Sequence, residues 1–173
     1  MPKLNCLDKY SNKSSKIVYV TTIESPIGEL VAAADEEYLY TVIFEDSKAF
    51  DKTFKILSEE LSCSFKEQKN DVLKQFEEEL KSYLSGNLKK FTVPIKTYGS
   101  DFQKEVWNKL LEIPYGSKQS YGDLAKSMGR PASHSRAVGA ACGANAHLVV
   151  IPCHRLVAAG SKSRCVLYDF HAS

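Results

Sequence analysis

The chain has 173 residues, with 43% hydrophobic and 25% charged side chains, which is ordinary for a soluble globular protein. It contains no apolar run near the roughly 18 residues that a membrane-spanning helix needs, and residues 1–16 lack the apolar segment of a signal peptide. The net charge of +2 is unevenly divided, because residues 1–96 carry 14 basic and 16 acidic side chains whereas residues 97–173 carry nine and five.

The first half of the chain is predicted to be an α+β domain. Residues 1–15 are polar and are expected to form a flexible leader. Three β-rich segments separated by turn signals predict an antiparallel meander, and two segments with helical spacing of apolar residues follow. The predicted strands are residues 16–24, 29–35 and 38–46, the predicted helices are residues 47–61 and 70–86, and residues 89–95 are an edge segment. In the second helix, Val72, Phe76, Leu80 and Leu84 form the apolar stripe.

A change of composition separates two predicted domains, residues 16–96 and residues 97–173. The second domain is predicted to begin with a helix capped by Ser100 or Asp101. The apolar face of that helix includes the single tryptophan, Trp107, which favours a role in the core.

A short helix, a glycine turn and a second helix follow, which is the pattern of a helix-turn-helix DNA-binding motif. The first helix is predicted over residues 121–128 with Ser120 as its cap, and the second runs from a Ser133 cap to about Cys142. The second helix contains small residues that permit close approach to a surface and one long cation, Arg136. Packing of the small residues against the first helix is the alternative explanation of the same pattern.

The helix-turn-helix pattern lies in the basic half of the chain. Between Ile113 and Tyr168 there are seven basic residues and a single acidic residue, Asp123. A basic face beside such a motif indicates a polyanionic partner, although the charge alone is explained equally well by a solvated surface.

Cys153 is the candidate nucleophile. It follows Pro152 and precedes His154 and Arg155, and the apolar run of residues 148–151 predicts a buried strand that ends at the proline. A neighbouring imidazole and guanidinium stabilise a thiolate, which is the nucleophilic form of cysteine. A rigid turn also suits an attack that requires in-line geometry.

The other cysteines indicate a reducing, intracellular environment. The five cysteines are odd in number and irregular in spacing, which argues against a disulfide framework. Cys63 and Cys142 are interpreted as small buried apolar residues. A zinc site on Cys6 and Cys63 is not expected, because all four histidines lie in the second half of the chain.

Four ordered motifs resemble the O6-alkylguanine-DNA alkyltransferase family, the methylated-DNA–protein-cysteine methyltransferases. The motifs are DFQKEVWNKLLEIPYGS, SYGDLAKSMGRP, SRAVGAACGAN and IPCHRLV, and the close match runs from about Phe102 to Val157. A fainter likeness includes SPIGELVAAAD and YLSG in the first half. The resemblance implies an α+β fold, with a ribonuclease-H-like N-terminal domain of antiparallel sheet and helices and a winged-helix-like C-terminal domain with the helix-turn-helix.

The resemblance implies direct-reversal DNA repair. Cys153 would attack the alkyl carbon of O6-alkylguanine, chiefly O6-methylguanine and as a further candidate O4-methylthymine, once the base has rotated out of the duplex. The thioether product makes each molecule act once, without a cofactor or a metal. By the same resemblance, His154 deprotonates Cys153 through a water, and Arg136 fills the space left by the base. Tyr121 helps to rotate the nucleotide and to protonate the departing guanine.

Further residues take supporting roles in this resemblance. The expected DNA contacts are Arg136, Tyr121, Ser133, Ala137, Gly139 and Arg155. Asn145 and Pro152 are expected to support the active-site turn, and small residues suit a recognition helix that enters the minor groove. The expected partner is double-stranded DNA containing O6-alkylguanine. The protein is expected to be a monomer without membrane association, located in the nucleus of a eukaryote and otherwise in the cytoplasm.

The chain departs from the family after Val157. It lacks the Gly-Tyr-x-x-Gly loop and the helix whose glutamate holds the histidine, and Asp169 is the only carboxylate side chain beyond Cys153. We therefore expect a poorly oriented His154, a less ionised Cys153 and uncovered apolar surface, as in a truncated or spliced form. An impaired relative that binds the lesion without repairing it is the alternative function. A helix-turn-helix regulator would leave the cysteine unexplained, and a cysteine hydrolase would leave the helix-turn-helix unexplained.

Overall fold

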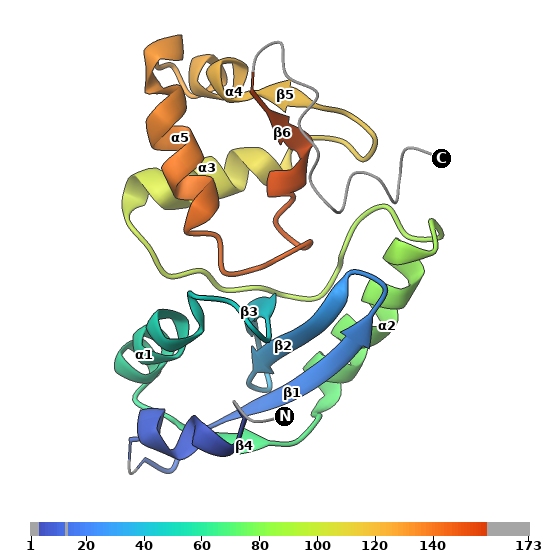
Figure 1. Cartoon of the computed structure of the whole chain (residues 1–173), viewed down its shortest axis with the longest axis vertical. Coiled ribbons are helices and arrows are strands. Elements are labelled where there is room, and N and C mark those ends of the chain that lie inside the picture. Colours follow the sequence, from blue (N-terminus) through green and yellow to red (C-terminus); the bar gives the residue numbers. More distant parts are fainter. Residues whose placement is uncertain (1–3, 13, 159–173) are drawn as a thin grey trace. The chain divides into compact units, whose positions relative to one another are not determined.

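The computed structural model describes residues 4–12 and 14–158, and the chain forms two compact units that divide between Tyr98 and Gly99 (Figure 1). The N-terminal unit combines a sheet with helices, whereas the C-terminal unit is mainly helical. This architecture agrees with the predicted α+β class. Within the described residues, no helix is both long enough and apolar enough to cross a membrane.

The N-terminal unit is built on a four-stranded sheet with the strand order β3-β2-β1-β4. Its elements are a 3-10 helix (Leu4–Tyr10), β1 (Ile17–Ser25), β2 (Gly28–Ala34), β3 (Leu39–Phe44), α1 (Phe50–Leu61), β4 (Ser64–Glu67) and α2 (Asp71–Leu84). Strands β1, β2 and β3 form the predicted antiparallel meander. The sequence pattern does not predict β4, which pairs in parallel with β1. This strand has only four residues and three of them are polar, so it carries no apolar alternation.

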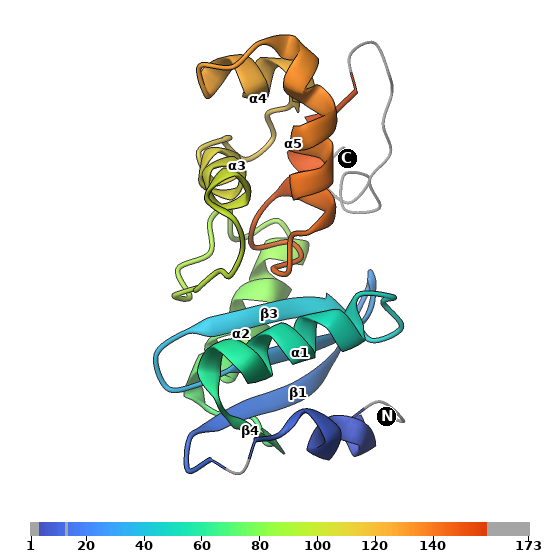
Figure 2. The ribbon, with the colours of Figure 1, turned by 90° about the vertical axis from the view of Figure 1, so that its left-hand side faces the viewer.

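The two helices of this unit lie on opposite faces of the sheet (Figures 1 and 2). The central strand β2 is covered on both sides, and residues 30–34 are fully buried. Successive side chains of a strand point to opposite faces. Val31 and Ala33 accordingly share one apolar cluster with Phe54 of α1. On α2, the buried stripe follows the predicted helical spacing.

The apolar stripe of α2 differs from the prediction at one residue. Val72, Phe76 and Leu80 are buried as expected. Tyr83 rather than Leu84 completes the stripe, since Tyr83 is buried and Leu84 is only half-buried. Steps of four, four and three residues keep the stripe on one side of a helix with 3.6 residues per turn.

The start of the chain corrects the expectation of a flexible leader. Residues 4–10 form a 3-10 helix in which Leu7 and Tyr10 are buried and join the core cluster beside α1. The hydroxyl of Tyr10 also hydrogen-bonds Asp51 of α1. Burial of two apolar side chains stabilises by about 1.5–3 kcal/mol each, which offsets much of the entropy lost in ordering a short segment.

The C-terminal unit consists of short elements. They are α3 (Asp101–Leu111), β5 (Gln119–Ser120), α4 (Tyr121–Ser127), a 3-10 turn (Ala132–His134), α5 (Ser135–Gly143), a 3-10 helix (Cys153–Arg155) and β6 (Leu156–Val157). Strands β5 and β6 pair in parallel. Figure 2 shows α4 and α5 joined by the turn that the sequence pattern predicts.

Helix α3 anchors this unit. It begins at the predicted Ser100, which forms a reciprocal capping box with Gln103. Trp107 is buried, and its indole N–H donates to the Ala141 carbonyl of α5 at 2.9 Å, so α3 and α5 are tied together. Gly99 is required at its position, because a β-carbon there would lie 2.7 Å from the Trp107 ring.

Candidate active site

The structure contains the predicted helix-turn-helix. Ser120 caps α4, because its Oγ accepts the N–H of Asp123 at 3.0 Å. After α4, Gly129 adopts a left-handed φ of +73°, a conformation that favours glycine. The N–H of Arg130 then donates to the Ala125 carbonyl at 3.0 Å, which closes the end of the helix and turns the chain toward α5.

The second helix of the motif starts later than predicted. Ser133 is not its cap but lies exposed in the 3-10 turn, and α5 begins at Ser135 without a side-chain cap. The reason is the hydrogen bond from the N–H of His134 to the Pro131 carbonyl at 3.0 Å, which forms a 3-10 turn before the α-helix can begin.

Helix α5 presents an exposed face of small residues with one long cation. Val138 and Ala141 are buried in the unit, whereas Arg136, Ala137 and Ala140 are exposed. Within the described part of the chain, Arg136 forms no ion pair with a carboxylate. Its guanidinium is therefore available to a partner, and the alanines allow that partner to approach the helix closely.

Tyr121 lies at the junction of the two helices. It is the first residue of α4, and a β-carbon at Gly139 of α5 would be 3.8 Å from its ring atom Cε1. That distance is ordinary van der Waals contact, so the glycine is not sterically required there. The contact places the half-buried tyrosine ring beside the exposed face of α5.

The segment before Cys153 consists of turns rather than the predicted strand. Val149 has a φ of +71°, which is uncommon for a β-branched residue and incompatible with a strand. Val149, Val150 and Ile151 are nevertheless buried, so the apolar run of residues 148–151 reflects burial and not extended pairing. The N–H of Cys153 donates to the Ile151 carbonyl at 2.8 Å, which fixes the entry into the 3-10 helix.

Asn145 holds this segment with both ends of its amide. Its Nδ2 donates to the Ile151 carbonyl at 3.0 Å and to the sulfur of Cys153 at 3.1 Å. Its Oδ1 accepts the N–H of His147 at 2.8 Å. One side chain thus fixes the backbone ahead of Cys153 and places a hydrogen-bond donor on its sulfur.

Cys142 is a candidate site residue that the sequence pattern does not reveal. The Cys153 thiol donates to the Cys142 carbonyl oxygen at 3.6 Å, which places Cys142 beside the Cys153 sulfur. The hydrogen bond from Cys142, with a second from Asn145, holds the pKa of Cys153 below its ordinary value although burial opposes this. The hydrogen bond to Cys153, together with burial, raises the pKa of Cys142, so the shared proton stays on Cys142.

This direction is opposite to the expectation of a less ionised Cys153. That expectation rested on a poorly oriented His154, whereas the lowered pKa has its causes in Cys142 and Asn145. The predicted departures from the family, including Asp169, fall in residues 159–173, which lie outside the described residues.

The residues that flank Cys153 lie within the protein. Pro152 and His154 are buried. The guanidinium of Arg155 donates from Nη1 to the Ile113 carbonyl at 2.6 Å and lies 5.8 Å from the centre of the Tyr115 ring. Arg155 therefore ties the 3-10 helix to the segment that follows α3.

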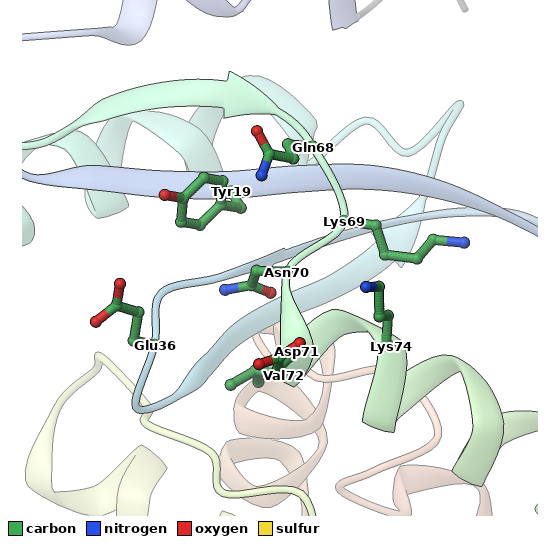
Figure 3. Close-up of a pocket in the computed structure, with 8 residues that line it drawn as sticks. All are labelled: Tyr19, Glu36, Gln68, Lys69, Asn70, Asp71, Val72 and Lys74. Atoms are coloured by element: carbon green, nitrogen blue, oxygen red, sulfur yellow. The ribbon is translucent and has the colours of Figure 1, made fainter.

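Other polar groups in the described residues offer no comparable chemistry. No cluster of three or more His, Cys, Asp or Glu side chains in that part of the chain could hold a metal ion. A pocket at the start of α2 is lined mainly by polar side chains of the N-terminal unit (Figure 3). The lining residues are Tyr19, Glu36, Gln68, Lys69, Asn70, Asp71, Val72 and Lys74. None is a cysteine or a histidine, and Lys69 pairs with Glu77, so we assign this pocket no role in catalysis.

Both units match known protein families. Residues 18–97 match the ribonuclease-like domain of 6-O-methylguanine DNA methyltransferase, and residues 101–165 match the DNA binding domain of 6-O-methylguanine DNA methyltransferase. The chain belongs to the methylated-DNA–protein-cysteine methyltransferase family. The resemblance seen in the four sequence motifs is thereby confirmed.

Relatives of this methyltransferase family match over most of the chain. The methylated-DNA–protein-cysteine methyltransferase of Methanosarcina acetivorans is 40% identical over 145 residues, which cover 84% of this chain and 86% of the relative. The O6-methylguanine methyltransferase of Mycobacterium tuberculosis has 29% identity and a TM-score of 0.74, covering 89% of this chain and 92% of that structure. The OGT of the same bacterium in complex with DNA has 32% identity and a TM-score of 0.69, covering 83% and 81%. These likenesses confirm the predicted fold class.

Proposed function

We propose that this chain repairs O6-alkylguanine in double-stranded DNA by transferring the alkyl group to Cys153. The observation that carries the proposal is the environment of the Cys153 sulfur, which accepts a hydrogen bond from Asn145 at 3.1 Å and whose pKa is lowered by Cys142 and Asn145. A thiolate on a rigid turn is the reagent that displacement at a carbon requires. Membership of a family of cysteine methyltransferases supports the same assignment.

The helix-turn-helix would supply the DNA-binding surface. The exposed small residues of α5 suit close approach to a groove, with Ser133, Ala137 and Gly139 along that approach. Arg136 is exposed and can enter the duplex, where its guanidinium stacks in the space that the extruded base leaves. Extrusion of a base costs a few kcal/mol, and it costs least for a weakly paired base. Damaged guanine is therefore favoured without any readout of the DNA sequence.

The reaction is a single displacement. The Cys153 thiolate forms a sulfur–carbon bond to the alkyl group while the bond from that carbon to guanine O6 breaks, and the released guanine takes up a proton. His154 assists the deprotonation of Cys153, and Tyr121 assists the protonation of the guanine. The thioether product does not reverse, so each molecule acts once and needs no cofactor. O6-methylguanine is the main substrate, with O4-methylthymine as a further one.

Asn145, Pro152 and Arg155 would position the acceptor. Asn145 acts on the sulfur and the preceding backbone, and Pro152 restricts the entry into the 3-10 helix. We assign Arg155 to the same task rather than to DNA, because its guanidinium already bonds the Ile113 carbonyl. The domains would be residues 16–96 and 97–173 of a monomer that works where its DNA lies, in a eukaryotic nucleus or otherwise in the cytoplasm.

A mass measurement tests the proposal. The protein is incubated with a duplex oligonucleotide that contains O6-methylguanine, and its intact mass is recorded. We expect one addition of CH₂ per molecule, located on Cys153 and lost in Cys153→Ala, while Cys63→Ala reacts like the parent. Lesion-specific binding without a gain in mass would contradict the proposal and favour a binding-only relative. Sequence-selective binding to undamaged duplex would favour a regulator instead.

A further inference from the structure

Two sulfur atoms lie together in the C-terminal unit, although an alkyl acceptor needs only one. Cys142 comes from the last turn of α5 and Cys153 from the start of the 3-10 helix that follows, and the Cys153 thiol donates to the Cys142 carbonyl oxygen at 3.6 Å. Both are half-buried free thiols, unlike Cys63, which is fully buried in the N-terminal core. In the displacement reaction the second sulfur only lowers the pKa of the first, and it forms no bond to the alkyl group.

We propose that Cys142 is a resolving cysteine, which converts peroxide-oxidised Cys153 into a reversible Cys142–Cys153 disulfide. The disulfide would block the sulfur that accepts the alkyl group, and a thiol reductant would restore it. Only this block rests on the proposed function. Formation of the disulfide requires a peroxide and two neighbouring sulfurs, and it is measurable without DNA.

The chemistry balances in two steps with hydrogen peroxide as the oxidant. The Cys153 thiolate attacks one peroxide oxygen, the O–O bond breaks, and the products are a sulfenic acid on Cys153 and hydroxide. The sulfur of Cys142, after loss of its proton to that hydroxide, attacks the sulfenic sulfur and displaces a second hydroxide, which takes up a proton to become water. Two thiols and one peroxide thus give one disulfide and two waters.

The first step also prepares the second. While Cys153 is a thiolate, its negative charge and its hydrogen bond keep the proton on Cys142. Conversion of Cys153 to a neutral sulfenic acid removes that charge, so Cys142 loses its proton more easily and becomes the nucleophile. Oxidation at Cys153 therefore activates the neighbour that resolves it.

The geometry permits the bond. A disulfide has a sulfur–sulfur distance of about 2.05 Å, so the two sulfurs must come closer together than a hydrogen bond would bring them. The side chain of Cys142 lies at the end of α5, one residue before its last residue, Gly143, where a helix yields most easily. The Cys153 thiol donates to the Cys142 carbonyl oxygen at 3.6 Å, so the Cys153 side chain already contacts the residue that carries the second sulfur.

Peptide mapping tests the proposal on the full chain. The reduced protein is treated with hydrogen peroxide, capped with iodoacetamide and digested with trypsin, which releases residues 137–155 as one peptide that holds these two cysteines and no other. We expect this peptide to be lighter by two hydrogens and uncapped after peroxide, and to regain two caps after dithiothreitol. A Cys153 disulfide to any other cysteine, or a peptide that keeps both caps, would overturn the proposal.

Two variants separate resolution from mere oxidation. In Cys142→Ala and in the closer isostere Cys142→Ser, the peptide should instead gain oxygen on Cys153 as sulfinic acid, which dithiothreitol does not reverse. Cys63→Ala is the matched control and should form the disulfide like the parent. If the Cys142 variants recover fully with dithiothreitol, Cys142 is not the resolving residue.

The alkyl-transfer assay then distinguishes the two proposals. Peroxide-treated protein should accept no methyl group from the O6-methylguanine duplex and should recover acceptance after dithiothreitol, with the untreated protein as reference. A disulfide that forms in protein whose reduced state accepts no methyl group would contradict the proposed function but leave the cysteine pair intact. Full acceptance by the disulfide form would overturn the block.

Discussion

Cys63 and Cys153 belong to different units and show what surroundings do to the same side chain. Cys63 is fully buried in the N-terminal core, where burial raises the pKa of its thiol to about 11. Cys153 is half-buried, and hydrogen bonds from Cys142 and Asn145 outweigh the effect of burial and lower the pKa of its thiol. Burial alone makes a thiol inert, whereas burial with placed donors yields a thiolate.

The two units also differ in whether apolar packing or side-chain hydrogen bonds join their elements. The N-terminal unit is stabilised mainly by apolar side chains packed on both faces of a sheet. The C-terminal unit joins short elements through single side chains that bond carbonyl groups: the partners of Trp107 and Arg155 lie 34 and 42 positions away, and that of Asn145 lies six positions away. We therefore expect the largest losses of stability in the first unit to follow lost side-chain volume, and the largest losses in the second to follow lost hydrogen bonds.

The largest effect is expected from a cavity in the N-terminal core. Phe54 is fully buried and stacks on Phe50 at 4.6 Å between ring centres. Phe54→Ala should lower the free energy of unfolding of this unit by about 3–5 kcal/mol, measured by urea denaturation with far-UV circular dichroism. Under native conditions the alkylation rate of Cys153 should be unchanged. A slower Cys153 in the folded variant would show that the two environments are not separate.

A smaller loss is expected from Asn145→Ala. The change removes one of the two hydrogen bonds that the Ile151 carbonyl accepts, and it removes a hydrogen bond from the Cys153 sulfur. We expect a cost of about 1–3 kcal/mol, read from the fluorescence of the single tryptophan, Trp107, during urea denaturation. Alkylation of Cys153 by iodoacetamide at neutral pH should also slow.

A matched variant in the other unit separates the loss of stability from the loss of the donor on the Cys153 sulfur. Asn12 makes the same kind of bond in the N-terminal unit, where its Nδ2 donates to the Ser58 carbonyl at 2.8 Å. Asn12→Ala should destabilise that unit by a similar amount and leave the reactivity of Cys153 unchanged. Equal slowing in both variants would mean that stability in general, and not the donor on the sulfur, controls the thiol.

The pattern of apolar residues predicts the regular elements well and the site poorly. The meander, α2 and the capped start of α3 follow from periodicity and capping signals that are local in the sequence. The same reasoning misses β4, whose pairing with β1 depends on a neighbour far away in the chain. It also interprets residues 148–151 as a strand, because a short buried run has the same composition whether it is extended or turned.

The site could be predicted only in part for a related reason. Cys153 and Asn145 are found through their motifs, because the family resemblance fixes both positions. The contact of Cys142 with Cys153 joins residues eleven positions apart through a turn, and no periodicity signals it. The hydrogen-bond partner of the Arg155 guanidinium depends in the same way on where the segment after α3 lies.

Cys142→Ala tests whether Cys142 lowers the pKa of Cys153. Without the hydrogen bond from Cys142, the pKa of Cys153 should rise. The sign follows from the reacting form: at a pH between the two pKa values the variant holds less thiolate and reacts more slowly with iodoacetamide. Well above both values the two proteins should react alike, so the pH profile shifts upward with an unchanged plateau. Cys63→Ala should keep the pH profile of the parent. An unshifted profile in Cys142→Ala would show that Cys142 does not lower the pKa of Cys153.

The smallest effect is expected at a surface ion pair of the C-terminal unit. Arg130 lies 3.4 Å from Glu105 between Nη2 and Oε2, and its guanidinium also covers the Phe102 ring at 5.0 Å. Glu105→Gln should cost only about 0–1 kcal/mol and less in high salt, because both side chains are partly exposed to solvent and the ring contact persists. Urea denaturation followed by Trp107 fluorescence at two salt concentrations measures it. A cost as large as that of Asn145→Ala would mean that a surface ion pair stabilises this unit as much as the hydrogen bonds of Asn145 do. Hydrogen bonds of single side chains would then not explain how the stability of this unit differs from that of the N-terminal unit.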